Sequence, residues 1–145
     1  MRKIYIAYGS NMDTEQMEFR CPDAKIVDTG KISGWRLMFK GSKTGNYATI
    51  EQEENFSVPV LVWEISEADE AELDYYEGFP KFYYKREIEV ELDDGRTVKG
   101  MAYIMHEERA LGQPSIKYLK KLAAAYDKFS FDLQILMKAF DYSAG

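Results

Sequence analysis

The sequence predicts an α+β protein: a small mixed, mostly antiparallel β-barrel with flanking α-helices. Short runs of alternating apolar residues recur through the first two thirds of the chain, and helical spacing dominates the C-terminal part. The strands do not alternate with helices as βαβ units would, so a mostly antiparallel or mixed sheet, curled into a barrel, fits best. No repeat or long linker divides the 145 residues, and we expect one domain over residues 1–145.

The first half of the chain predicts four strands and one short helix. Asp13 is the expected N-cap of the helix, Gln16 can return the bond as in a capping box, and Pro22 ends it. The acidic run 51–54 is most simply a solvated loop. The strands are expected at residues 3–8, 35–40, 47–50 and 58–65.

The second half predicts three helices and a hairpin. Ser66 can cap a helix that stops at Gly78, a natural left-handed residue. Ser115 is expected to cap the next helix and Ser130 to open the last one. An Asp-Gly turn predicts a tight hairpin between two strands, at residues 83–92 and 97–105.

Composition excludes several classes of function. The formal charge of −6 opposes a phosphate backbone, so we expect no nucleic-acid partner. No signal peptide and no apolar run of about 20 residues is visible, so we expect a soluble, cytoplasmic protein without a membrane partner. One cysteine, Cys21, and one histidine, His106, make neither a disulfide nor an ordinary metal site, and no short motif pairs them for nucleophilic catalysis.

Tyr8-Gly9-Ser10-Asn11 lies where the first strand ends and the short helix approaches. Glycine permits a sharp turn, and successive N–H groups ahead of a helix can bind a carboxylate or phosphate. Gly, Ser and Asn are also common in ordinary turns. The local pattern leaves both interpretations open.

Glu77 is the candidate acid or base. It lies four residues after Leu73, toward the buried face of its helix, and in the last turn, where the helix dipole disfavours a carboxylate. Aromatic neighbours would remove water and raise its pKa further. An exposed, helix-ending glutamate is the competing interpretation. The aromatic neighbours are Tyr75, Tyr76, Phe79, Phe82, Tyr83 and Tyr84.

Five segments in order resemble the γ-glutamylcyclotransferase-like family. They are Tyr8-Gly9-Ser10-Asn11, the run 47–51, the helix end 73–78, Phe82-Tyr83 and the Pro-Ser-x-x-Tyr segment 114–118. The resemblance covers nearly the whole chain and implies a compact mixed fold around a small barrel. The entry to the second segment, residues 44–47, has fewer glycines than expected for the family.

The resemblance implies a reaction without cofactor or metal. The α-amine of a γ-glutamyl amino acid or amine attacks its own γ-carbonyl, which releases the amino acid or amine and closes 5-oxoproline. Glu77 matches the catalytic glutamate, and the loop from Tyr8 to Asn11 would hold the substrate's α-carboxylate. By the same resemblance, Tyr83 and Tyr118 would complete the pocket.

Three questions stay open at this point. The same pocket could remove a γ-glutamyl group from a biosynthetic intermediate, or bind a small anion without turnover. The protein could be a monomer or a homodimer. Motif spacing selects Tyr83 for the pocket, whereas strand alternation places Tyr84 with the apolar face, so Tyr83 would need a bulge or a late strand start to point inward.

Overall fold

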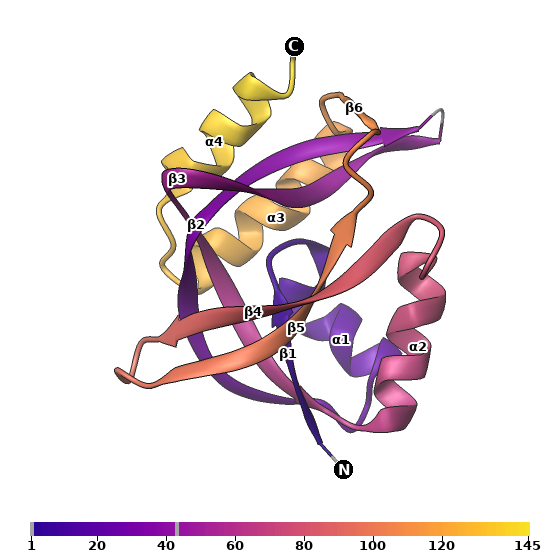
Figure 1. Cartoon of the computed structure of the whole chain (residues 1–145), viewed down its shortest axis with the longest axis vertical. Coiled ribbons are helices and arrows are strands. Elements are labelled where there is room, and N and C mark those ends of the chain that lie inside the picture. The colour runs from indigo at the N-terminus through magenta and orange to yellow at the C-terminus, as the bar shows by residue number, and fades with distance from the viewer. Residues whose placement is uncertain (1, 43) are drawn as a thin grey trace.

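The computed structural model describes residues 2–42 and 44–145 and builds a closed five-stranded barrel (Figure 1). Going round the barrel, the strand order is β3-β1-β5-β4-β2, and β2 pairs back to β3. The pair β1–β5 is parallel and the other pairs are antiparallel. The predicted fold class is confirmed. The strands are β1 (Lys3–Ala7), β2 (Lys25–Ser42), β3 (Gly45–Ile65), β4 (Tyr83–Leu92), β5 (Thr97–Met105) and the added β6 (Ala110–Leu111).

The strands β2 and β3 are much longer than the alternation pattern predicts. Register shifts after Ile26 and after Ser33 bend the pair, so its first part closes the barrel and its far part forms a two-stranded arm. The expected strands 47–50 and 58–65 are therefore one strand, and the expected loop 51–54 was wrong. Glu51 and Gln52 pair with β2, residues 53 and 54 belong to the irregular stretch of β3 at the register shift, and the acidic side chains stay largely exposed.

The helices α1 (Thr14–Arg20) and α2 (Glu67–Glu77) begin where their caps predict. The Asp13 carboxylate accepts from the backbone N–H groups of residues 15 and 16, but the Gln16 side chain bonds elsewhere, so the predicted capping box was wrong. Ser66 forms a capping box at the start of α2. Gly78 ends that helix with φ 65°, in the left-handed region that favours glycine.

Ion pairs and a hydrogen bond hold α2 against the barrel wall. Lys85 Nζ on β4 lies 2.7 Å from Glu70 Oε2 and 2.9 Å from Asp74 Oδ1. Lys3 on β1 lies 2.9 Å from the other oxygen of Glu70, and the Tyr103 hydroxyl on β5 donates to Asp74 at 2.6 Å. Three strands thus fix the helix whose last residue is Glu77.

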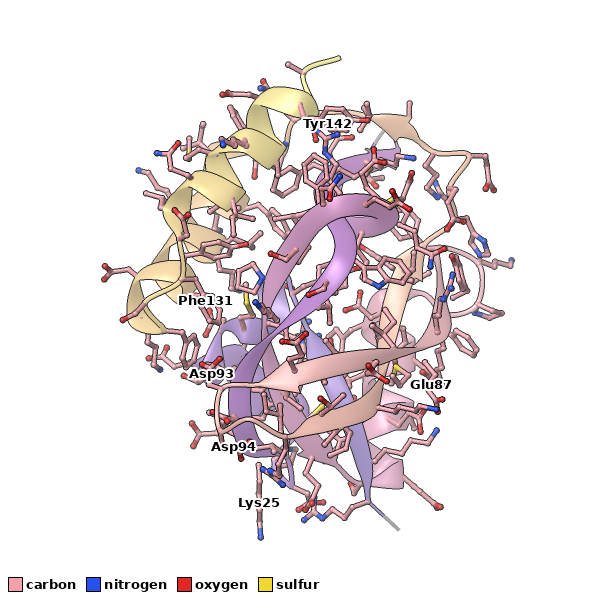
Figure 2. All side chains as sticks on the ribbon, turned by 60° about the vertical axis from the view of Figure 1, so that its left-hand side comes forward. Lys25, Glu87, Asp93, Asp94, Phe131 and Tyr142 are labelled. Carbon is pink, nitrogen blue, oxygen red and sulfur yellow. The ribbon has the colours of Figure 1, made fainter. Side chains whose placement is uncertain are left out.

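The predicted hairpin β4–β5 is confirmed, with its turn at one end of the barrel, where Figure 2 labels Asp93 and Asp94. The backbone N–H of Asp94 donates to Asp28 Oδ2 at 3.0 Å. This bond fastens the turn to β2, next to the pairing of Gly30 with Leu92 that closes the barrel.

The helices α3 (Ile116–Lys128) and α4 (Leu133–Tyr142) pack against the arm of β2 and β3 (Figure 1). Ser115 caps α3 as predicted. The cap of α4 is Asp132, not Ser130, which adopts φ 58° in the preceding turn. The Phe39 N–H donates to Ser143 Oγ at 2.8 Å and joins the arm to the end of α4. Across residues 2–42 and 44–145, no helix combines the length and apolar character needed to cross a membrane.

Candidate active site

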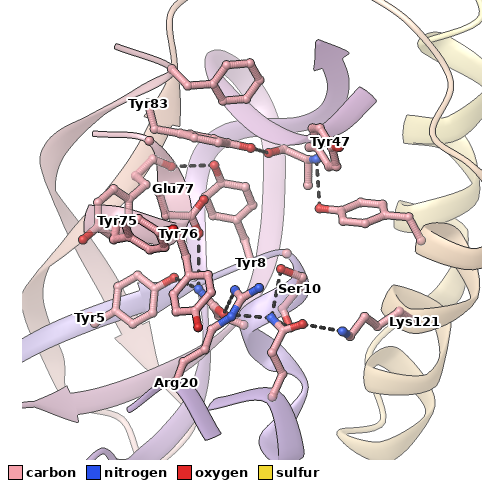
Figure 3. Close-up of a pocket in the computed structure, with 18 of the residues that line it drawn as sticks. Tyr5, Tyr8, Ser10, Arg20, Tyr47, Tyr75, Tyr76, Glu77, Tyr83 and Lys121 are labelled. Carbon is pink, nitrogen blue, oxygen red and sulfur yellow. Dashed lines mark hydrogen bonds between the residues drawn. The ribbon is translucent and has the colours of Figure 1, made fainter. Parts of the chain in front are cut away.

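A cavity of about 490 Å³ lies between the barrel wall and the helices α1, α2 and α3 (Figure 3). Its lining draws on segments from both halves of the chain and is rich in tyrosine. Every residue that the sequence proposes for the site lines this one cavity: Glu77, Tyr8, Gly9, Ser10, Asn11, Tyr83 and Tyr118. Their chemical roles remain predictions.

Gly9 follows β1 at a point where the backbone touches its neighbours. A Cβ atom here would lie 3.3 Å from the Ala48 Cβ and 3.4 Å from the Tyr118 hydroxyl oxygen. The first contact is tight and the second is an ordinary van der Waals contact, so a side chain at residue 9 requires the loop or β3 to shift by a few tenths of an ångström. Tyr8 before it is buried, and its hydroxyl donates to the Tyr103 carbonyl at 2.5 Å.

A short 3-10 helix, Ser10–Met12, follows Gly9. The N–H groups that open a helix have no acceptor inside it. Within residues 2–42 and 44–145, the backbone N–H groups of Gly9, Ser10 and Asn11 have no hydrogen-bond acceptor. Successive N–H groups without an acceptor can bind a carboxylate, and this favours the anion-binding interpretation over the ordinary turn.

Asn11 connects the loop to the other groups of the cavity. Its side chain is buried, and its amide Nδ2 donates to the Tyr5 hydroxyl at 2.9 Å and to Glu77 Oε1 at 3.3 Å. Its Oδ1 accepts from Gln16 at 3.0 Å and from Arg20 at 3.1 Å. The amide is therefore saturated and held in one orientation, with its donor side toward Glu77.

Glu77 faces the cavity from the last turn of α2, on the same side of the helix as the buried Leu73. Burial raises the pKa of its carboxyl group to about 7, and the positive charge of Arg20 opposes part of that rise. Near neutral pH the group is thus divided between its acid and base forms. That state suits a group that must accept a proton and then return it.

The aromatic surroundings of Glu77 agree only partly with the sequence prediction. Phe79 and Tyr84 lie outside the lining: the Lys85 ammonium packs 4.3 Å from the Phe79 ring centre, and the Tyr84 hydroxyl bonds to Glu107. The other four predicted neighbours line the cavity, namely Tyr75, Tyr76, Phe82 and Tyr83.

Tyr83, not Tyr84, faces the cavity, and it does so without a bulge. The register between β4 and β5 is unbroken from Tyr83 to Glu91, so Tyr83 lies on the opposite face from Tyr84 and Ile88. Ile88 belongs to the buried face of β4. The expected bulge or late start was wrong because the cavity lies on the outer face of the barrel wall, under α2.

Tyr83 and Tyr118 both bond to the backbone of Ala48 (Figure 3). The Tyr83 hydroxyl donates to the Ala48 carbonyl at 2.9 Å. The Tyr118 hydroxyl accepts from the Ala48 N–H at 3.1 Å, so its own proton remains available to a ligand. Burial raises the pKa of both hydroxyls, which keeps them protonated.

Several lining residues were missed by sequence reasoning: Tyr5, Gln16, Arg20 and Lys121. Gln16 and Arg20 are four residues apart on α1 and so share a face, which was the available signal. Gln16 was assigned to a cap instead. Lys121 follows Tyr118 by three residues on α3, a spacing that also places two side chains together.

Cys21 and His106 lie outside the cavity lining. Cys21 is buried with its thiol 3.6 Å from the Asp69 carbonyl, and burial raises its pKa to about 12. His106 Nε2 lies 2.7 Å from the Pro80 carbonyl oxygen. Among the residues that the structure describes, no three His, Cys, Asp or Glu side chains are grouped to hold a metal ion.

A mixed barrel with one carboxyl group of near-neutral pKa in an outer, tyrosine-lined cavity is an arrangement typical of small-molecule sites that use acid–base chemistry. The family model described as "Gamma-glutamyl cyclotransferase, AIG2-like" matches residues 5–120. The chain belongs to this family.

Relatives agree with this assignment. A human protein named gamma-glutamylcyclotransferase is 29% identical over 95% of this chain and 78% of its own length. A mouse protein of the same name is 28% identical over the same shares. A solved structure titled gamma-glutamyl cyclotransferase, 27% identical, superimposes with a TM-score of 0.84 over 96% of this chain and 86% of that one.

Proposed function

We propose that this protein is a γ-glutamylcyclotransferase, which converts a γ-glutamyl amino acid or amine to 5-oxoproline and the free amino acid or amine by intramolecular aminolysis. One observation carries the proposal: Glu77, with a pKa of about 7, shares a cavity with the three unpaired N–H groups of residues 9–11. The substrate supplies its own nucleophile, so the protein has to position it and carry protons from the attacking nitrogen to the departing one.

Glu77 is proposed as the proton carrier. Its carboxylate takes a proton from the substrate's α-ammonium group, and the freed amine attacks the γ-carbonyl carbon. The carboxylic acid of Glu77 returns this proton to the departing nitrogen, and the C–N bond to the leaving group breaks. A second proton then passes by the same route from the attacking nitrogen to the released amine. The products are the lactam of 5-oxoproline and an ammonium ion, and the Glu77 carboxylate is restored. Atoms and charge balance without water or a cofactor.

The loop after β1 is proposed to hold the substrate's α-carboxylate. Its N–H donors at Gly9, Ser10 and Asn11 would fix the carbon that bears the attacking amine. The amide of Asn11, bonded to Glu77, places the loop and the carboxyl group at a fixed separation. The Tyr118 hydroxyl, which accepts from the Ala48 N–H, can donate its proton to the developing oxyanion or to a substrate oxygen.

A substrate panel tests the proposed function. We expect the purified protein to form 5-oxoproline from at least one member of a set of γ-glutamyl dipeptides and γ-glutamyl amines. The set includes larger γ-glutamylated compounds, so a preference for these would indicate removal of a protecting group. Absence of 5-oxoproline from the whole panel would contradict the proposal.

The pH dependence of kcat/KM tests the state of Glu77. Only the carboxylate can accept the proton, so we expect kcat/KM to rise about tenfold from pH 6 to pH 8, with a midpoint near the pKa of about 7. Measurement with a γ-glutamyl dipeptide over this range checks it. A flat profile would exclude Glu77 as the base.

The cytoplasmic location and a monomeric or homodimeric state are part of the same proposal. The free thiol of Cys21 is compatible with a reducing compartment. Fractionation of cells and light scattering of the purified protein would measure the two properties directly.

A further inference from the structure

The cavity has a positive lining in a chain whose net charge is −6. Arg20 from α1 and Lys121 from α3 line it, whereas Glu77 is the one acidic residue among the lining residues of the described chain. Because the pKa of Glu77 is about 7, its negative charge is incomplete at neutral pH. The cavity is therefore suited to a ligand with more than one negative charge.

The two cations occupy different sides of the cavity. Arg20 bonds to Asn11 Oδ1 at 3.1 Å, and its guanidinium lies 4.2 Å from the Tyr76 ring centre, so it belongs to the group around Glu77. Lys121 extends into the cavity from α3, and Figure 3 shows it across the cavity from Glu77.

Lys121 keeps bonding capacity for a ligand. Its ammonium donates to Gln16 Oε1, and Asp13 Oδ2 lies 3.6 Å away. Asp13 Oδ1 caps α1 and accepts from two backbone N–H groups there. An ammonium has three donors, and 36% of the Lys121 side chain is exposed, so a carboxylate can reach it. Gln16 and Asp13 together hold the ammonium at the cavity rim.

We propose that Lys121 binds a carboxylate on the leaving group, so that the protein prefers γ-glutamyl amino acids to γ-glutamyl amines. This inference rests on the proposed cyclotransferase function. The loop N–H groups already account for the α-carboxylate of the glutamyl part, and Glu77 accounts for its amine. The carboxylate of the departing amino acid is then the one substrate charge without an assigned partner. Lys121 is the lining cation to which no role has been assigned.

Two substrates that differ only by this carboxylate provide the test: γ-glutamyl-alanine and γ-glutamyl-ethylamide. The ratio of their kcat/KM values is measured in the wild type, in Lys121→Met and in the control Lys120→Met. Lys120 is the exposed neighbour on α3, and it is absent from the cavity lining. Comparing ratios between variants cancels the intrinsic difference between the two leaving groups.

We expect Lys121→Met to lower the ratio about fivefold, the effect of one partly exposed ion pair. Lys120→Met should keep the wild-type ratio. An unchanged ratio in Lys121→Met, or an equal loss on both substrates, would overturn the inference and leave the proposed function standing. No 5-oxoproline from either substrate with the wild type would overturn the inference, and absence of 5-oxoproline from the whole panel as well would contradict the proposed function.

Discussion

Replacing Glu77 with glutamine is expected to reduce kcat about 10³-fold, because the amide can neither accept the proton of the attacking amine nor return one to the leaving amine. Glutamine keeps the size of the side chain and one oxygen that can accept from Asn11, as Glu77 Oε1 does at 3.3 Å. Binding of substrate should therefore change less than turnover. The measurement is kcat and KM for 5-oxoproline formation. Turnover at the wild-type rate would remove the assigned role.

The stability of Glu77→Gln at two pH values tests the raised pKa of Glu77 independently of catalysis. Because burial raises the pKa of Glu77 from 4.5 to about 7, the folded state binds its proton more tightly than the unfolded state. Protonated Glu77 therefore adds to the free energy of unfolding. This contribution is fully present below about pH 4.5 and is lost as pH rises through about 7. We thus expect Glu77→Gln to be more stable than the wild type at about pH 8, with a smaller difference at about pH 5. Urea unfolding at both values measures this, and a variant less stable at pH 8 would contradict it.

Replacing Asn11 with alanine is expected to lower the free energy of unfolding by about 2–3 kcal/mol and kcat by at least about tenfold. The change removes the buried amide that bonds Tyr5, Gln16, Arg20 and Glu77, and leaves several of those groups without a partner. Denaturant unfolding and steady-state kinetics check the two effects. A folded Asn11→Ala variant with wild-type kcat would show that the amide does not position Glu77.

Tyr5→Phe is the matched comparison. It removes one of the hydrogen bonds of Asn11, at 2.9 Å, and leaves those to Glu77 and Arg20 in place. We expect a loss of about 0.5–1.5 kcal/mol in stability and a smaller loss of kcat than in Asn11→Ala. Equal kinetic losses in the two variants would assign the effect to Tyr5 instead.

Local signals predict the helices and the hairpin well. The caps at Ser66, Gly78 and Ser115 depend on backbone geometry within a few residues, and the structure reproduces each of them. Two local details were wrong, the capping box of Asp13 with Gln16 and the cap at Ser130, but the larger failure lies where distant pairing decides. The acidic run 51–54 is polar enough for a loop, but it lies within β3, where residues 51 and 52 pair with β2. Alternation alone contains no information about such a partner.

The residues of the cavity also differ in whether local sequence or only the fold reveals them. The position of Glu77 near a buried helix face could be predicted from its spacing to Leu73. Spacing indicates that Arg20 shares a face with Gln16 and Lys121 with Tyr118, but only the packing of α1 and α3 around the loop after β1 places those faces at the cavity. The question of Tyr83 against Tyr84 also needed the fold, since it depends on which face of the barrel wall carries the site.

The central claim is that the substrate's own amine, and not water, displaces the leaving group. Incubation of the protein with γ-glutamyl-alanine in H₂¹⁸O, followed by mass spectrometry of the products, tests it most directly. We expect one 5-oxoproline per alanine released, with no ¹⁸O in the product. Glutamate carrying ¹⁸O in its γ-carboxyl group would instead establish hydrolysis and contradict the proposed role of Glu77 as proton carrier for an intramolecular attack.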